Sequence, residues 1–233
     1  MNKNIVPIFA ETSWIAQSSY EGHSADSKDI IKYIKSRADI EDHETHMVAP
    51  HIKHGLIESA SSLDLFNTKE KVIVDLHKYL EAEIFDIFVS LMTRKGREFK
   101  IDSRAEIVES WYHITSNGGY HDTHTHEHTS FAGIYFISVK ECGPKNGAIR
   151  FYQPFRIPRI FLGRDVDDIG LKWTDPESLD FDPEDGDIII WPGFIPHMAI
   201  PYFGKSDRIV IAFNARILEY YKNGNYTRPP RKL

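Results

Sequence analysis

Four of the twelve histidines in this chain lie within eight residues, at positions 121, 124, 126 and 128. Because His124 and His126 are two residues apart, both side chains point to the same face if the segment is an extended strand. A metal ion needs neutral imidazoles that converge at about 2.1 Å, and this spacing lets one strand supply two of them. Histidines crowded near a turn are equally often solvated polar residues. The pair alone therefore indicates either a metal site or a polar loop.

A third candidate ligand follows an apolar run late in the chain. The run Ile188–Trp191 is followed by Pro192-Gly-Phe-Ile-Pro196 and then directly by His197. An apolar strand that ends in this proline-bounded turn places one histidine at the mouth of a β barrel. His197 could therefore approach the first pair from a different strand.

Arg208 opens another apolar run, eleven residues after His197. If this run is a regular strand, Arg208 shares one face with Val210 and Ala212, and Asn214 lies on that same face. An arginine among small residues can direct its guanidinium into a barrel and bind a carboxylate through two parallel hydrogen bonds. A salt bridge at the end of the strand is the alternative role for Arg208.

The second half of the chain carries the elements that would position these residues. From about residue 105, short β-branched or aromatic runs are separated by Gly, Pro and Asn, a pattern typical of strands and turns. Several such strands predict an all-β barrel or sandwich. The expected strands are residues 107–114, 131–139, 148–152, 187–191 and 208–217.

The first hundred residues show helical periodicity instead. Ser24 can cap a helix that continues to about Arg37, and an apolar stripe with three-and-four spacing predicts a longer helix from Thr68 to Met92. Helices first and strands later indicate that the helices pack on the outside of the β core. We expect one domain over residues 1–233, with a mainly helical flank at 1–104, the β core at 105–218 and a tail at 219–233.

Composition indicates the reducing cytoplasm and argues against nucleic-acid and membrane partners. The net charge is −6, whereas nucleic acids and anionic membrane surfaces favour basic proteins. Cys142 is the only cysteine, which excludes an intrachain disulfide. No apolar run approaches the roughly 20 residues of a membrane span, and the amino-terminal segment has no signal-peptide hydrophobic region. We therefore expect a cytoplasmic protein with no nucleic-acid or membrane partner.

The combination of paired histidines, a distal histidine and an arginine shortly after it resembles the 2-oxoglutarate- and Fe(II)-dependent oxygenase superfamily. Within it, the chain is similar to a bacterial and phage group of 2OG-Fe(II) oxygenases with a His-x-His motif. The likeness covers residues 107–217, and the helical first hundred residues carry no matching motif. It implies a double-stranded β-helix core, of the jelly-roll or cupin type, flanked by helices. The stretches that carry the likeness are residues 124–136, 186–192 and 208–214.

The resemblance implies a role for each of three residues. His124 matches the first metal histidine, and His197 matches the distal one. Arg208 matches the residue that pairs with the far carboxylate of 2-oxoglutarate. Asn214, which faces inward beside Arg208 on a regular strand, is a further candidate for binding this co-substrate.

The remaining metal ligand is where the sequence departs from the superfamily pattern. Most members carry a carboxylate two residues after the first histidine, which gives a face of two histidines and one carboxylate. His126 occupies that position here, so we favour a three-histidine iron centre of His124, His126 and His197. The alternatives are a repurposed site that binds metal weakly, or a ligand supplied by a neighbouring residue: His121, Asp122 or Glu127.

The implied activity is that of a 2-oxoglutarate- and Fe(II)-dependent dioxygenase, an oxidoreductase with one non-haem iron. Such an enzyme uses O2 to hydroxylate or otherwise oxidise a substrate, and 2-oxoglutarate is converted to succinate and CO2. The expected substrate is a small molecule, such as an amino-acid derivative or a secondary metabolite. Homodimers are the commonest soluble oligomers, so a homodimer is the default oligomeric state. The candidate pocket residues are Trp111, His113, Tyr120, Tyr135, Phe151 and Trp191.

Two other functions fit part of this pattern. A cupin-type dioxygenase holds iron with three histidines on a similar barrel and works without 2-oxoglutarate, but it needs no dicarboxylate anchor such as Arg208. A non-catalytic β barrel could carry a metal-binding site. Against that second function, a scaffold has no physical need to bring three separated motifs together.

Overall fold

The described part of the chain contains two helices and eleven strands. This computed structural model describes residues 4–7, 13–38, 55–59, 63–94, 102–126, 128–154 and 178–220. The helices are α1 (His23–Ala38) and α2 (Lys71–Arg94). The strands are β1 (Asn4–Pro7), β2 (Trp14–Ser19), β3 (Leu56–Glu58), β4 (Asp102–Thr115), β5 (Gly119–His124), β6 (Phe131–Ser138), β7 (Ile149–Tyr152), β8 (Ser178–Phe181), β9 (Asp187–Pro192), β10 (His197–Tyr202) and β11 (Arg208–Tyr220).

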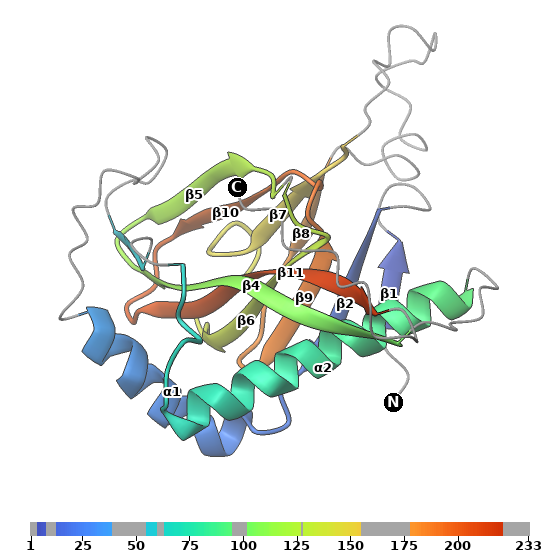
Figure 1. The fold of residues 1–233 in the computed structure, drawn as a ribbon. Helices are drawn as coiled ribbons and strands as arrows, with labels where there is room; N and C mark the ends of the chain where they lie inside the picture. The colour runs from blue at the N-terminus through green and yellow to red at the C-terminus, as the bar shows by residue number, and fades with distance from the viewer. Residues whose placement is uncertain are drawn as a thin grey trace, which may run out of the picture.

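Two antiparallel sheets form the body of the protein, and both helices lie along the outer face of the larger sheet (Figure 1). The larger sheet has the strand order β1-β2-β9-β6-β11-β4-β3, and the smaller sheet has the order β5-β10-β7-β8. Consecutive strands alternate between the sheets along much of the core, as a jelly roll requires. The architecture is the helix-flanked double-stranded β-helix that the sequence predicts.

The larger sheet separates two apolar cores. Along β11, Ile209 and Ile211 belong to a core shared with the helices, which we call the helix-side core. Val210 and Ala212 point the opposite way into an inter-sheet core, which also contains Phe151 of the smaller sheet. Successive side chains of a strand point to opposite faces, so one strand can serve both cores.

Both predicted helices are confirmed, with small shifts at their ends. In α2, the residues Ile73, Leu76 and Leu80 follow helical spacing and are fully buried in the helix-side core. Neither helix in the described part of the chain is both long enough and apolar enough to cross a membrane.

The five predicted strands correspond to β4, β6, β7, β9 and β11. No strand was expected from the sequence at β1, β2, β3, β8 or β10. Of these, β2 adds to the larger sheet by pairing with β9, so the amino-terminal flank also contributes strands to the β core. The strand β10 begins with a histidine and contains Pro201, and neither residue gives a strand pattern.

Candidate metal centre and cofactor pocket

His124 and His197 face each other on neighbouring strands of the smaller sheet. Antiparallel pairing of β5 with β10 makes them direct cross-strand partners, and such partners lie on the same face of a sheet. Nδ1 of His124 lies 2.8 Å from the backbone oxygen of Asp122, and Nδ1 of His197 lies 3.0 Å from that of Ile195. A carbonyl oxygen can only accept, so Nδ1 carries the hydrogen in both rings. Each Nε2 therefore keeps its lone pair for a metal ion.

His126 reaches the same space from a loop. The strand β5 ends at His124, where its pairing with β10 also ends, so the expectation that one strand carries both histidines is wrong. The backbone N–H of His126 instead donates to the oxygen of Gly193, in the turn between β9 and β10, at 2.7 Å. This bond holds the loop close to β10, and the His126 ring stacks against the His197 ring with 5.1 Å between centroids.

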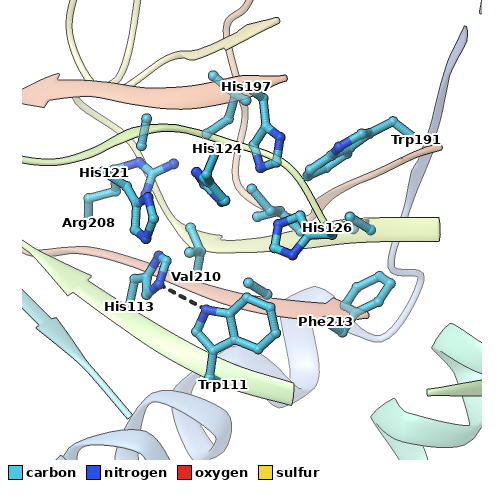
Figure 2. A pocket seen from close by; sticks show the side chains of 16 residues that line it. Trp111, His113, His121, His124, His126, Trp191, His197, Arg208, Val210 and Phe213 are labelled. Atoms are coloured by element: carbon cyan, nitrogen blue, oxygen red, sulfur yellow. Dashed lines mark hydrogen bonds between the residues drawn. The ribbon is translucent and has the colours of Figure 1, made fainter. Parts of the chain in front are cut away.

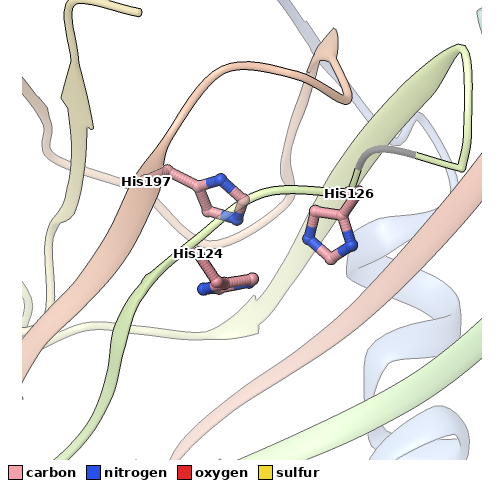
Figure 3. Close-up of side chains that lie close together, drawn as sticks. All are labelled: His124, His126 and His197. Atoms are coloured by element: carbon pink, nitrogen blue, oxygen red, sulfur yellow. The ribbon is translucent and has the colours of Figure 1, made fainter.

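The three imidazoles point toward a common space (Figure 3). One ligand atom from each lies within 4.8 Å of the other two, so together they could hold one metal ion. Burial, helped by the neighbouring histidines, lowers the pKa of His126 to about 4 and that of His197 to about 3. The same causes hold the pKa of His124 far below its usual range. All three rings are therefore neutral at pH 7, which is the form that binds a metal ion.

The other residues considered as the third ligand do not join this group. Within the described segments, His124, His126 and His197 are the one group of this kind. The His121 ring lies 4.1 Å from the His124 ring, measured between centroids, but stays outside the group. The side chain of Asp122 is also outside it, and Glu127 lies outside the described residues. The geometry thus favours His126 over His121 and Asp122.

Arg208, the first residue of β11, is buried between the sheets with 2% of its surface exposed. Its Nε donates to the backbone oxygen of Gly147 at 3.1 Å, and its guanidinium lies 5.6 Å from the centroid of the Phe136 ring. Burial lowers the pKa of this guanidinium, but an arginine stays protonated in proteins. Its Nη2 has no hydrogen-bond partner among the described residues. A buried cation with an unpaired donor is stabilised when an anion occupies the adjoining space.

The three histidines and Arg208 line a single cavity between the sheets (Figure 2). Of the six predicted pocket residues, Trp111, His113 and Trp191 contribute to its walls, whereas Tyr120, Tyr135 and Phe151 do not. Tyr135 faces the helix-side core, where its hydroxyl bonds to Nδ1 of His23 at 2.8 Å. The apolar part of the wall consists mainly of Ala132, Ile134, Ile149, Val210 and Ala212.

Asn214 lies farther along β11, outside the cavity lining. Its Nδ2 donates to Oε2 of Glu109 on β4 at 2.6 Å. Its Oδ1 is buried and has no partner among the described residues. The predicted contact between Asn214 and 2-oxoglutarate stays a prediction.

Glu58 supports the pocket although the sequence analysis did not single it out. Its Oε1 lies 2.9 Å from Nε2 of His113. Nε1 of Trp111 lies 3.0 Å from the same nitrogen, as the dashed line in Figure 2 marks. If Glu58 is ionised, Nε2 of His113 must donate to it and cannot also accept from the indole. Glu58 belongs to the three-residue strand β3, which is too short to give a sequence pattern.

Comparison with known proteins agrees with this geometry. Residues 109–214 match the family model described as "putative 2OG-Fe(II) oxygenase", and this range contains all three histidines and Arg208. No curated protein matches the sequence significantly. A structure similar to the present one is that of SnoK, a non-haem α-ketoglutarate-dependent carbocyclase from nogalamycin biosynthesis. It shows 11% identity, covers 89% of this chain and 81% of that chain, and has a TM-score of 0.59.

Two further solved structures show the same fold. A prolyl-4-hydroxylase from Pseudomonas putida is 11% identical, with 87% of this chain and 92% of that chain covered and a TM-score of 0.51. HygX from Streptomyces hygroscopicus, with nickel and 2-oxoglutarate bound, is 12% identical, with 88% and 83% covered and a TM-score of 0.51. The expected cofactors, Fe(II) and 2-oxoglutarate, are those of the matching family, and His124, His126 and His197 could hold the metal. Residues 109–214 are thus similar to the 2OG-Fe(II) oxygenase family model, and the chain shares the fold of these solved structures.

Proposed function

We propose that the protein is a 2-oxoglutarate- and Fe(II)-dependent dioxygenase that hydroxylates, or otherwise oxidises, a small molecule. One observation carries this proposal: three neutral imidazoles converge in the cavity that Arg208 also lines, and Nη2 of Arg208 has no partner among the described residues. The imidazoles suit a divalent metal ion, and the guanidinium suits a carboxylate. 2-Oxoglutarate can engage both, because it has a chelating keto acid at one end and a carboxylate at the other.

In this proposal, His124, His126 and His197 hold the iron. Three neutral ligands do not offset the charge of the metal ion. The net charge of the centre is therefore one unit more positive than that of a centre with two histidines and one carboxylate. Dianionic 2-oxoglutarate offsets this charge together with that of Arg208. When bound, iron and 2-oxoglutarate supply the oxidising chemistry: O2 is consumed, 2-oxoglutarate becomes succinate and CO2, and a substrate C–H becomes C–OH.

The protein's own residues bind, orient and exclude water. Arg208 holds the far carboxylate, and the exclusion of water makes this ion pair stronger than one at the surface. Hydrogen bonds from Nδ1 to the backbone fix the rings of His124 and His197, so that Nε2 of each points toward the metal position. Small and aliphatic side chains make up much of the cavity wall around these groups.

The substrate class that we propose is a small metabolite, such as an amino-acid derivative or a secondary metabolite. Among the structural neighbours, HygX has been solved with hygromycin B bound, whereas a prolyl hydroxylase from Trichoplax adhaerens holds a peptide fragment. The small-molecule class is favoured because the cavity lies between the sheets and is lined mainly by apolar and aromatic side chains.

Anaerobic titration of the purified protein with Fe(II) and then 2-oxoglutarate tests the proposed function. We expect a visible charge-transfer band from the chelated complex and, in air, formation of succinate. Arg208→Lys should weaken 2-oxoglutarate binding by about tenfold or more, because an ammonium cannot form the paired hydrogen bonds of a guanidinium. The matched control is Arg150→Lys, since Arg150 pairs with Asp180 away from the cavity.

Each other outcome selects a different function. Tight iron binding without the band would overturn the role of 2-oxoglutarate and favour a three-histidine, cupin-type dioxygenase. Absence of iron binding would leave a non-catalytic β barrel. An equal loss of 2-oxoglutarate binding in the Arg150→Lys control would show that the effect of the Arg208 substitution is not local.

A further inference from the structure

A row of four residues crosses the larger sheet on neighbouring strands, and two of the four, Ala132 and Trp191, line the cavity. In the register of the larger sheet, Glu109 of β4 pairs with Asn214 of β11, Asn214 pairs with Ala132 of β6, and Ala132 pairs with Trp191 of β9. Directly paired residues share a face, and both Ala132 and Trp191 line the cavity. Asn214 therefore faces the same side of the sheet as the cavity wall.

The row contains a buried donor and a buried acceptor that both lack partners. Trp191 is 1% exposed and Asn214 is 5% exposed. Neither Nε1 of Trp191 nor Oδ1 of Asn214 has a hydrogen-bond partner among the described residues. Native proteins leave few buried polar atoms unpaired, and those that remain often mark the place of a ligand or water. Arg208 supplies a third such atom on this face, and the proposed co-substrate already accounts for it.

The two unpaired atoms flank the smallest side chain of the row. Ala132 lies between Asn214 and Trp191, and adjacent strands are about 4.8 Å apart, so the two outer Cα atoms are separated by roughly 10 Å. Ala132 contributes only a methyl group between them. The indole of Trp191 extends into the cavity beside the His126 and His197 rings (Figure 2), with 4.7 Å between its centroid and that of His197. A ligand group held there would lie close to the proposed metal position.

The chemistry of the pair selects the kind of group that fits. An indole N–H can only donate, and an amide oxygen can only accept. Because Nδ2 of Asn214 donates to Glu109, the oxygen Oδ1 is the end of the amide that remains available to a ligand. A hydroxyl group satisfies both atoms at once, because it accepts through its oxygen and donates through its hydrogen. The nearby wall, formed by Ile134, Val210 and Ala212 among others, suits an apolar skeleton around that hydroxyl.

We propose that Trp191 and Asn214 form a substrate subsite, which binds a hydroxyl group on a compact apolar skeleton. The proposal rests on the proposed oxygenase function for the reaction that follows binding. Asn214 lies six residues beyond Arg208, or roughly 20 Å along an extended strand. It is therefore far from the co-substrate anchor and outside the cavity lining, but it is paired with Ala132, which lines the cavity. In this proposal, Asn214 binds the substrate and does not bind 2-oxoglutarate. Glu109 is a positioning residue that orients the amide of Asn214.

Three ring compounds test the subsite: cyclohexanol, methoxycyclohexane and cyclohexane. Cyclohexanol can donate and accept, its methyl ether can only accept, and the hydrocarbon can do neither. Dissociation constants are measured by ligand-detected NMR on the metal-free protein and again with Zn(II) and 2-oxoglutarate added. We expect wild type to bind cyclohexanol about fivefold more tightly than the ether, and the ether more tightly than the hydrocarbon.

Two variants assign the two hydrogen bonds separately. Asn214→Leu should remove the preference for cyclohexanol over the ether, because no acceptor remains for the hydroxyl hydrogen. Trp191→Phe keeps an aromatic side chain but removes the indole N–H. It should therefore remove the preference for the ether over the hydrocarbon, because no donor remains for the ether oxygen. Trp14→Phe is the matched control, since Trp14 is buried in the helix-side core, and it should keep all preferences. Thermal unfolding of each variant shows whether it is folded.

Several results would overturn the subsite. Equal binding of the three compounds to wild type would do so, as would an undetectable affinity for cyclohexanol. Preferences that persist in both Trp191→Phe and folded Asn214→Leu would show that other groups recognise the hydroxyl. Failure of the proposed oxygenase function is seen separately, as loss of the Fe(II)–2-oxoglutarate band, because hydroxyl preference is also measured on metal-free protein.

Discussion

The two faces of β11 show two different uses of burial. Toward the helices, Ile211 packs in a core where a buried hydroxyl is paired, as the bond between Tyr135 and His23 illustrates. Toward the smaller sheet, Arg208 and Asn214 are also buried, yet each has a polar atom without a partner among the described residues. Both faces exclude water. Buried polar atoms without a hydrogen-bond partner among the described residues also occur elsewhere, on Ser13, Ser18, His77 and Ser103, but those of Arg208, Asn214 and Trp191 belong to the inter-sheet face.

In the proposed function, the unpaired atoms of the inter-sheet face bind ligands, and they lower the stability of the ligand-free protein. An unpaired buried donor or acceptor costs about 1–3 kcal/mol, and a buried cation costs more unless it is paired. Proteins commonly tolerate such groups at functional sites, where a ligand supplies the missing partner. Substitutions on the two faces should therefore separate stability from ligand binding.

The largest effect expected is on the metal centre. His124→Ala removes one of three converging imidazoles and should weaken Fe(II) binding by more than about 100-fold, because even residues that only orient a ligand contribute 10- to 100-fold. Equilibrium dialysis with metal analysis measures this loss. His23→Ala, a histidine substitution on the helix side, should leave metal affinity unchanged.

The identity of the third ligand can be tested in the same experiment. His126→Ala should weaken Fe(II) binding, and His126→Asp should restore it, because the aspartate recreates the common carboxylate position. If His126→Ala bound iron as tightly as wild type, another residue would have to be the third ligand.

The second effect is on stability alone. Ile211 is fully buried in the helix-side core, so Ile211→Ala should lower the free energy of unfolding by about 2–5 kcal/mol. Urea denaturation measures this change. Fe(II) affinity of the folded variant should match wild type, and a large drop in affinity would mean that the two faces are not independent.

The contrast also explains how much could be predicted from the sequence. His124, His197 and Arg208 could be named as candidates because residue type and local spacing carry their signal, and the strand alternation that places Arg208 between the sheets is equally local. The row from Glu109 to Trp191 depends on the register of four strands that are far apart in the sequence. No local pattern encodes that register.

Local spacing also failed at His126. The His-x-His pattern suggested one continuous strand, but β5 ends at His124 where its partner strand ends. A backbone bond to Gly193, nearly seventy residues away in the chain, holds His126 in place. The His-x-His pattern thus predicted that the two histidines lie close together. The backbone conformation that brings His126 there depends on a tertiary contact, which the pattern does not contain.

The smallest expected effect is a change in the free energy of unfolding at Arg208. It is the sharpest test of the difference between the two faces of β11, because the sign of the change should depend on whether ligand is bound. Arg208→Met replaces a buried cation with an apolar side chain of similar length. In metal-free protein without 2-oxoglutarate, this should raise the free energy of unfolding by about 1 kcal/mol, since the desolvated charge is removed. The lost bond to Gly147 limits the gain.

Adding Fe(II) and 2-oxoglutarate should reverse the order of stability. A ligand at 100 times its dissociation constant stabilises the state that binds it by about 2.7 kcal/mol, and the Met variant should lose most of this stabilisation. Thermal unfolding with and without both ligands measures the reversal. A variant less stable than wild type under both conditions would make Arg208 a structural residue, because its charge would then stabilise the fold without a ligand.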